Sequence, residues 1–277
     1  MTGRLSIVST PIGCLEDITL RALRVLGEAD VILAEDTRHT RTLCAKHGIE
    51  TPLRSFHAHT SDRKLAAVID ALTGGAHYAL VSDAGTPMVS DPGAYLVSRA
   101  VSAGVVVEAV PGPSAVLAAL SVSGLPTGRF TFEGFLPRAG KERRAALERM
   151  AESTATVVFF ESPHRIHATL EELETYMDVR RRVAICRELT KLHEQVIRGT
   201  LPNVQRALAD SPKGEITVVV EPSSNPPSAE RLDIEALVAR WKEEGLTTKD
   251  MAERLRDEHG WKRKAAYQAV LESLAED

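Results

Sequence analysis

Short apolar segments alternate with amphipathic segments along the first half of the chain. The apolar segments have the length and composition of buried strands and comprise residues 5–9, 31–34, 78–82 and 105–110. Residues 64–72 and 94–103 have helical spacing, and a further helix is expected after Asp17 or Thr19, with Leu20, Leu23 and Leu26 on its buried face. This repeated strand–turn–helix order predicts an α/β domain with a mostly parallel sheet over residues 1–122.

A second set of strands begins near Leu125. The expected strands are residues 129–133, 156–160, 182–186 and 216–220, and the expected helices are residues 141–151 and 167–176. Because little helix separates several of these strands, antiparallel pairing is expected here. The pattern predicts a second α/β domain over residues 123–222.

A run rich in proline and serine, residues 223–229, interrupts both patterns and has the composition of a linker. Residues 230–277 are polar and helical, with helices expected at 234–243, 248–259 and 262–274. Short helices joined by turns containing glycine fit a helix-turn-helix module. A purely structural three-helix cap fits the same pattern, so both readings stay open.

Composition narrows the class of protein. Aromatic residues make up 4% of the 277 residues and the net charge is −4, so stacking platforms for bases are few and any basic surface must be local. The three cysteines are far apart, without metal-ligand spacing, so no metal site is expected. No apolar run approaches the ~18 residues of a membrane span and no signal peptide is evident, which favours a cytoplasmic protein without a membrane partner.

Several nucleotide and hydrolase motifs are missing from the sequence. There is no G-x-G-x-x-G after the first strand and no G-x-x-x-x-G-K-[ST], which disfavours a nicotinamide Rossmann domain and a P-loop NTPase. Polar and small residues gather instead where strands end, at residues 35–40, 82–87, 110–115, 160–165 and 187–194. Ligands of open α/β sheets bind outside the carboxyl ends of strands, so these turns predict a cleft between two α/β halves.

The turn Ser82–Pro87 is the first candidate for a ligand site. Its small residues let a ligand approach the backbone, whose N–H groups can bind a carboxylate, and Asp83 could hold an ammonium group or ribose hydroxyls. A loop shaped only by glycine and proline is the alternative. The polar turn at residues 160–165 contains Glu, Ser, His and Arg, but adjacency in sequence does not create the geometry of a catalytic triad.

Six motifs in order closely resemble the ribosomal RNA small subunit methyltransferase I family of the tetrapyrrole methylase-like superfamily. They are Ser9–Thr19, Ala34–Thr40, Ser82–Pro87, Val110–Ala115, Phe160–Arg165 and Arg187–Lys191. The resemblance covers roughly residues 4–222, and the helical module matches the family's usual tail. It implies two α/β domains of the class III methyltransferase type with a cofactor cleft between them, a small C-terminal three-helix module, and a homodimer.

The resemblance also implies an activity and a set of site residues. The activity is S-adenosylmethionine-dependent methylation of the ribose 2′-oxygen of a decoding-region cytidine, number 1402 in the usual numbering of 16S rRNA, with the small ribosomal subunit as partner. The implied cofactor contacts are Pro11, Val81, Asp83, Gly85, Thr86, Ser114, Ala115, Phe160, Glu161, Leu189, Gly214 and Glu215.

One motif departs from the wider superfamily. Many tetrapyrrole methylases carry a G-x-G-x-G-D run near the N-terminus, where this chain reads Ser9–Gly13, and this disfavours a porphyrinoid substrate. Two alternatives stay open. One is a small-molecule, tetrapyrrole-type methyltransferase on the same fold. The other is a DNA-binding regulator that uses the C-terminal helices, although these lack an excess of basic residues.

A ribose hydroxyl is a weak nucleophile at neutral pH, so a base or a cation that stabilises the alkoxide is expected. The catalytic candidates are Lys191, Glu161 and Asp36, with Glu188 as a further base and Arg38 as a further cation. The candidate RNA contacts are Arg38, His57, His59, Arg138, Arg143, Arg144, Arg165, Lys262, Arg263 and Lys264, and residues 180–182 form another basic cluster. Each of these is also explained by an ordinary solvated surface.

Overall fold

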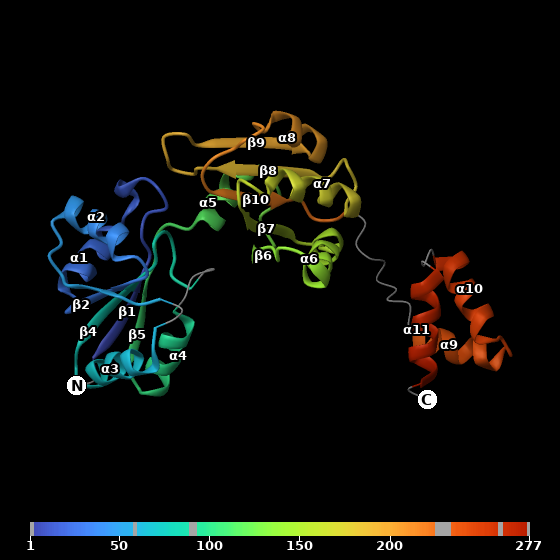
Figure 1. The fold of residues 1–277 in the computed structure, drawn as a ribbon, viewed down its shortest axis with the longest axis horizontal. Helices are drawn as coiled ribbons and strands as arrows, with labels where there is room; N and C mark the ends of the chain where they lie inside the picture. The colour runs from blue at the N-terminus through green and yellow to red at the C-terminus, as the bar shows by residue number, and fades with distance from the viewer. Residues whose placement is uncertain (1–2, 58–59, 89–92, 225–233, 260–262, 276–277) are drawn as a thin grey trace. The chain divides into compact units, whose positions relative to one another are not determined.

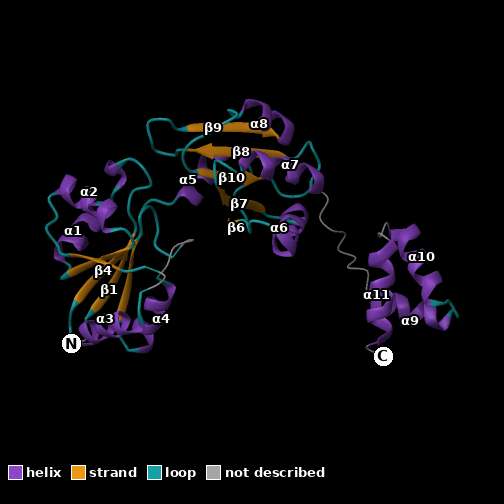
Figure 2. Cartoon of the chain, viewed as in Figure 1, coloured by secondary structure: helices purple, strands orange, loops and turns teal. Residues whose placement is uncertain are grey.

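The computed structural model describes residues 3–57, 60–88, 93–224, 234–259 and 263–275 (Figure 1). The chain divides into two compact units, residues 1–223 and 224–277. Within the described ranges, the first unit contains two sheets with their helices and the second contains helices only (Figure 2). The expected fold class is confirmed. The domain boundary at residues 122 and 123 stays a prediction, and most of the expected linker lies outside the described residues.

The first sheet is parallel throughout, as the sequence pattern predicts. Its strand order is β3-β2-β4-β1-β5. The strands are β1 (Arg4–Val8), β2 (Val31–Ala34), β3 (Leu53–Ser55), β4 (His77–Val81) and β5 (Val106–Val110). All the carboxyl ends of these strands therefore meet at one edge, where the polar turns follow.

Helices cover both faces of the first sheet because the strands are apolar on both sides. Helices α1 (Leu20–Glu28) and α2 (Thr37–His47) pack on the face that carries Ile32 and Ala34. Helices α3 (Asp62–Thr73) and α4 (Ala94–Ser102) pack on the opposite face, which carries Val31 and Leu33. The 3-10 helix η1 (Leu15–Asp17) lies between β1 and α1.

Three details differ from the expected pattern in this sheet, and one of them is the short strand β3, which was not expected. Leu20 is not on the buried face of α1: it is the first helical residue, its side chain is 87% exposed, and Ala22, Val25 and Leu26 are buried instead. The turn after β2 is in part the first turn of α2, which Asp36 caps. Helix α2 was not expected because its sequence is largely polar, so the apolar spacing that reveals a helix is weak.

The second sheet is mixed. Its strand order is β6-β7-β10-β8-β9, in which β6 and β7 are parallel and the other neighbouring pairs are antiparallel, as expected for this half. The strands are β6 (Phe130–Phe135), β7 (Thr156–Glu161), β8 (Arg182–Arg187), β9 (Gln195–Thr200) and β10 (Ile216–Val220). The sequence pattern did not reveal β9, which is half exposed and mostly polar.

The helices of the second sheet also lie on both faces. Helices α6 (Gly140–Glu152), α7 (Ile166–Tyr176) and α8 (Leu201–Ala207) share a core with Phe159 and Val218. Helix α5 (Ala115–Ser123) packs on the other face against Val158 and Val219. Helix α5 follows β5 directly, so the segment after the first sheet carries the chain onto the second sheet.

The second unit consists, in its described part, of α9 (Ile234–Glu243), α10 (Thr248–His259) and α11 (Arg263–Ala275), which confirms the expected helical module. Its core surrounds the fully buried Trp241 and includes Leu255 and Val270. Among all the described helices of the chain, none is long and apolar enough to cross a membrane. The described residues also contain no group of three His, Cys, Asp or Glu side chains that could hold a metal ion.

A polar cluster lies across neighbouring strands β4, β1 and β5. Ser6 Oγ donates to Glu108 Oε1 at 2.6 Å and lies 2.8 Å from His77 Nε2, while Arg4 Nη2 lies 3.3 Å from His77 Nδ1. Because the serine proton goes to Glu108, His77 Nε2–H donates to Ser6 and Nδ1 accepts from Arg4. The neutral ring therefore fits this site. Burial and then the charge of Arg4 lower the pKa of His77, and this shift is opposed by a hydrogen bond to the backbone of Glu28 and by the charges of Glu108 and Asp30.

His77 is expected to make folding stability dependent on pH. Since its pKa is lower in the folded state than the ordinary 6.5, the unfolded state binds more protons just below that value, and stability falls as pH decreases below about 6.5. The variant His77→Gln should show a smaller loss of stability between pH 7 and pH 5 in urea unfolding. Equal losses in the variant and the wild type would contradict this assignment.

Candidate active site

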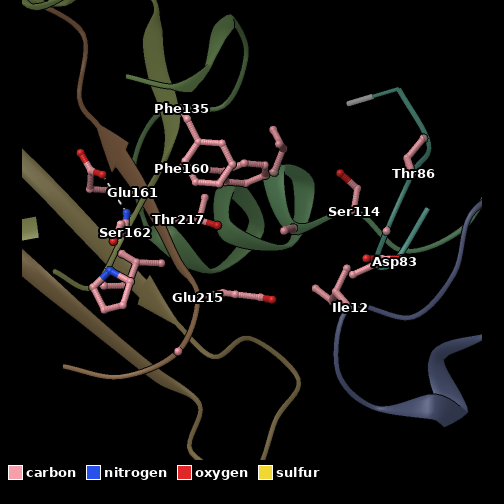
Figure 3. A pocket seen from close by; sticks show the side chains of 17 residues that line it. Ile12, Asp83, Thr86, Ser114, Phe135, Phe160, Glu161, Ser162, Glu215 and Thr217 are labelled. Carbon is pink, nitrogen blue, oxygen red and sulfur yellow. Dashed lines mark hydrogen bonds between the residues drawn. The ribbon is translucent and has the colours of Figure 1, made fainter. Parts of the chain in front are cut away.

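An apolar cavity of about 410 Å³ lies where the strand-end turns of the two sheets face each other (Figure 3). Asp83, Thr86 and Ser114 line it from the first sheet and α5, and Phe135 and Phe160 line it from the second sheet. The remaining lining residues are Ile12, Ala84, Gly85, Ala115, Val116, Glu161, Ser162, Pro163, Gly214, Glu215, Ile216 and Thr217. The size lies within the ~300–1,000 Å³ range of small-molecule sites.

A polar cavity of about 450 Å³ adjoins it. The two cavities share Ile12, Asp83, Ala84 and Glu215. The other residues of the polar cavity are Thr10, Pro11, Gly13, Leu15, His39, Thr40, Thr42, Leu43, Ser82 and Lys191. The second cavity is thus the more polar of the two adjoining cavities, with hydroxyl, imidazole and ammonium groups in its lining. The first cavity is mainly apolar and includes two phenylalanine rings.

Hydrogen bonds join the turns after β1, β4 and β5 into one wall of the cleft. Thr10 and Gly85 exchange two backbone hydrogen bonds, of 2.9 and 3.0 Å. Ser9 Oγ donates to Thr86 Oγ1 at 3.1 Å, and Thr86 Oγ1 donates to the carbonyl of Pro113 at 3.1 Å. Gly85 has a φ of 76°, and a Cβ there would lie 3.2 Å from Ile12 Cγ2. The wall is therefore preorganised and needs glycine at this position.

The N-terminus of α5 opens onto the apolar cavity. Ser114 is its N-cap and Ala115 and Val116 its first residues, and all three line the cavity. Unpaired backbone N–H groups and the helix dipole favour negative charge at such an end. The opposite wall is aromatic: the ring centroids of Phe135 and Phe160 lie 5.5 Å apart. The cavity can thus hold a carboxylate at one end and a flat ring at the other.

Glu161 is a structural anchor of the cleft. Its side chain is fully buried, and its carboxylate accepts from Ser162 N at 2.7 Å, Thr169 Oγ1 at 2.7 Å and Arg165 Nη2 at 3.1 Å. Figure 3 shows the bond between Glu161 and the backbone of Ser162. A carboxylate held by these bonds fixes the turn after β7, and its lone pairs are already engaged. The geometry therefore does not support Glu161 as a general base.

Asp36 is equally engaged, with different partners. Its carboxylate caps α2 by accepting from Arg38 N at 2.8 Å, and it pairs with the Arg38 side chain. These bonds lower the pKa of Asp36 to about 2. Such a carboxylate is a weak base, and Asp36 lines neither of the two cavities. The structure places its backbone near the cleft instead, where Asp36 N donates to Asp83 Oδ1 at 2.9 Å.

Lys191 is the candidate that the structure places best. It lines the polar cavity, and its Nζ donates to Glu188 Oε1 at 2.9 Å and to Glu215 Oε2 at 3.1 Å. Burial lowers the pKa of Lys191, but the hydrogen bonds to the two glutamates outweigh burial, so the pKa is raised overall. Lys191 is therefore a permanent cation at neutral pH and suits the stabilisation of an anion.

Most of the expected cofactor contacts lie at the cleft. Asp83, Gly85, Thr86, Ser114, Ala115, Phe160, Glu161, Gly214 and Glu215 line the apolar cavity, and Pro11 lines the polar one. Val81 and Leu189 line neither and are buried in the cores behind the turns. Sequence reasoning missed Ile12, Phe135 and Thr217. Thr217 could have been found, because it lies in β10 just after the predicted contacts Gly214 and Glu215. Nothing in the sequence shows that Phe135 faces Phe160.

The basic residues proposed as RNA contacts fall into different classes. Arg143 is a correction: it is buried, because its guanidinium binds Glu172 at 2.6 Å, Thr169 at 2.9 Å and the Pro137 carbonyl at 3.0 Å. Arg165 is partly buried, and its Nη2 donates to Glu161 and to the Leu136 carbonyl. The Arg143 guanidinium is therefore not available for phosphate, whereas the role of Arg165 stays a prediction.

The cluster at residues 180–182 is internally neutralised. Arg180 pairs with Asp178 and Arg182 pairs with Glu221, while Arg181 is buried and donates to backbone carbonyls at the end of α6. The sequence shows three adjacent basic residues but not the acidic and carbonyl partners that fold against them. This cluster therefore offers little free positive charge.

Other candidates remain on the surface. Arg138 and Arg144 are exposed, and no ion pair within the described residues involves them. His57 is exposed, and Arg38 is exposed while paired with Asp36. His59 and Lys262 lie outside the described residues, as do the side chains of Arg263 and Lys264 at the start of α11. Arg138 and Arg144 are thus the clearest basic candidates of the first unit.

Comparison with known proteins shows which family this chain belongs to. Residues 4–205 match the profile of the Tetrapyrrole (Corrin/Porphyrin) Methylases. The chain is 45% identical over 268 residues to the ribosomal RNA small subunit methyltransferase I of Xylella fastidiosa, covering 96% of this chain and 98% of that protein. This chain belongs to the ribosomal RNA small subunit methyltransferase I family. The resemblance of the six motifs is thereby confirmed.

Two further members of the family differ in how much of this chain they match. The member from Mycobacterium tuberculosis is 43% identical over 278 residues and matches 99% of this chain and 97% of its own length. The member from Thermotoga maritima is 48% identical over 220 residues, which are 98% of its length but only 79% of this chain. About a fifth of this chain therefore has no counterpart in that family member.

Solved structures share the fold of the first unit. The uroporphyrin-III-C-methyltransferase from Thermus thermophilus superposes with a TM-score of 0.54 at 24% identity, covering 79% of this chain and 92% of that one. The methyltransferase CobJ superposes with a TM-score of 0.62 at 18% identity, covering 80% and 95%. At this identity the likeness concerns the fold, which is the class III methyltransferase fold expected from the motifs.

Proposed function

We propose that this chain is an S-adenosylmethionine-dependent methyltransferase that methylates the ribose 2′-oxygen of a decoding-region cytidine, number 1402, of 16S rRNA. The observation that carries the proposal is the pair of adjoining cavities, one mainly apolar and one more polar, which share Asp83 and Glu215 in their linings. A methyl transfer enzyme needs two such adjoining sites, one for the donor and one for the acceptor. The names of the family members supply the class of acceptor.

The residues of the apolar cavity fit the chemistry of S-adenosylmethionine. The N-terminus of α5, at Ser114 and Ala115, suits its carboxylate, and Asp83 suits an ammonium group or ribose hydroxyls. Phe135 and Phe160 suit the adenine ring. Small residues such as Gly85 keep the backbone open to close approach. We propose Pro11, Thr86, Gly214 and Glu215 as neighbouring contacts.

The polar cavity is the proposed site of the acceptor ribose. Bound next to it, the cofactor supplies an electrophilic methyl group with a good leaving group, so positioning accounts for much of the rate. The chain's part is to orient the ribose hydroxyl and to stabilise negative charge on its oxygen with the Lys191 ammonium. The hydroxyl can donate to Thr40 Oγ1 or Thr42 Oγ1, which accept because their own protons go to backbone carbonyls. Because Asp36 and Glu161 are already engaged in hydrogen bonds and Lys191 stays protonated, the hydroxyl proton passes to solvent water as the methyl group is transferred.

RNA binding is proposed for the exposed basic residues near the start of α6. Arg138 and Arg144 are unpaired there among the described residues, so each can contact phosphate. Arg38 and His57, which lie at or near strand ends of the first sheet, are further proposed contacts. We also propose a homodimer that acts in the cytoplasm. The support for the homodimer is the resemblance of the six motifs to this family.

The activity is tested by transfer of a labelled methyl group. We expect purified protein and labelled S-adenosylmethionine to label the 16S rRNA of small subunits from a strain that lacks this protein, and we expect no label on subunits from the complemented strain. A porphyrinoid acid serves as the competing acceptor. Label on the porphyrinoid and none on rRNA would replace the proposal with the small-molecule alternative.

A further inference from the structure

The loop that joins β8 to β9 carries a partly buried set of hydrogen bonds that holds Lys191. Glu188 and Thr190 have φ values of 53° and 64°, a left-handed conformation that is unusual for residues with side chains. Glu188 N donates to the Glu215 carbonyl at 2.9 Å, and Lys191 N donates to the Glu188 carbonyl at 3.0 Å. These bonds hold the strained backbone in place. Strain of this kind persists where the surroundings over-determine it, often beside a functional site.

The Glu188 side chain is held as firmly as its backbone. Its Oε1 accepts from Lys191 Nζ at 2.9 Å and from the backbone N–H of Glu215 at 3.0 Å. The side chain is only 18% exposed, while that of Glu215 is 74% exposed. Glu188 is thus the more buried partner of the ammonium, and Glu215 is the more exposed one. The hydrogen bond to Lys191, opposed by burial, lowers the pKa of Glu188.

Gly214 makes room for this carboxylate. It has a φ of 89°, and a Cβ at this position would lie 2.2 Å from both Cδ and Oε1 of Glu188. Any residue other than glycine at position 214 would therefore place its Cβ in the space that the Glu188 carboxylate occupies. Gly13 makes room for the Lys191 side chain in the same way, since a Cβ at residue 13 would lie 2.5 Å from Lys191 Cγ.

We propose that Glu188 is a positioning residue that holds the Lys191 ammonium at the polar cavity, with Gly214 providing the space for its carboxylate. The proposal rests on the proposed function, because it assigns Glu188 to the acceptor side of that reaction. Glu188 touches neither cavity and acts only through Lys191. It follows that removing its charge matters only while Lys191 is present.

The test combines a double-mutant cycle with a chemical probe. Glu188→Gln keeps the shape of the side chain and removes its charge. We expect its kcat for methyl transfer to fall at least tenfold, its cofactor Kd to stay within threefold, and its thermal unfolding to remain cooperative. The double variant Glu188→Gln/Lys191→Met should be no slower than Lys191→Met alone. Glu152→Gln, an exposed glutamate at the end of α6, is the control and should behave as wild type.

The probe is acylation of Lys191 by acetic anhydride at pH 9, followed by peptide mass spectrometry on the whole protein without cofactor or RNA. Loss of the anionic partner should free the amine for reaction, so Lys191 should be acylated several times faster in Glu188→Gln than in wild type. Unchanged acylation, or an equal loss of kcat in the Lys191→Met background, would overturn the proposal. If wild type labels no RNA, the proposed function fails, and acylation alone decides the positioning.

Discussion

Replacement of Lys191 with methionine is expected to lower the turnover of methyl transfer by ~10²–10³-fold, the range found when one preorganised stabiliser of a developing oxyanion is removed. The reason is the position of its Nζ, which two glutamates hold at the border of the polar cavity. The cofactor Kd should change less than about threefold, because Lys191 does not line the apolar cavity. Single-turnover kinetics and calorimetry measure the two quantities separately.

Lys64→Met is the matched control, since Lys64 is exposed on α3 and lines neither cavity. The raised pKa of Lys191 adds a second expectation. The group stays protonated up to and beyond its ordinary value of 10.5, so the turnover of wild type should show no step due to Lys191 between pH 6 and 9. A Lys191→Met variant that keeps half of the wild-type turnover would remove this residue from the mechanism.

Two adjacent arginines on α6 are expected to give opposite results. Arg143→Met should lower the free energy of unfolding by ~2–4 kcal/mol, because the buried Thr169 hydroxyl and Pro137 carbonyl lose a charged partner. Arg144→Met should change that free energy by less than ~0.5 kcal/mol, since the side chain is exposed. Urea unfolding of both variants measures the difference.

The affinity for RNA should also distinguish the Arg143 and Arg144 variants, but here the Arg144 variant should show the larger effect. If Arg144 contacts a phosphate, its variant binds 16S rRNA more weakly, and the slope of log K against log salt falls in magnitude by ~0.7–0.9. Arg143→Met, compared at a temperature where it is folded, should keep the wild-type slope. A reduced slope in the Arg143 variant with an unchanged slope in the Arg144 variant would reverse this assignment.

The sequence predicts the fold well where apolar periodicity is strong. Strands such as β4 and β10 are nearly continuous apolar runs, and the bounds of α9 and α10 are the expected ones. Helix α2 and strand β9 escaped detection because they are mostly polar and take their place from tertiary packing. Leu20 shows a different limit, since an apolar residue at the first position of a helix need not face the core.

The candidate site was predicted in outline but not in its internal bonding. The polar strand-end turns predicted the cleft, because the carboxyl ends of parallel strands meet at one edge of the sheet. Sequence could not show that Glu161 and Arg143 are joined through Thr169 in a buried network, since these partners come from β7, α6 and α7. It could not show that Gly214 makes room for Glu188 either. Such contacts depend on how distant segments meet, which a single sequence does not record.

The most direct test of the central claim is a map of 2′-O-methylated riboses in 16S rRNA from cells with and without this protein. We predict that methylation of the 2′-oxygen at cytidine 1402 is lost without the protein, returns with the wild-type chain, and does not return with Lys191→Met expressed at the same level. A methylation map that is identical in the two strains would contradict the account.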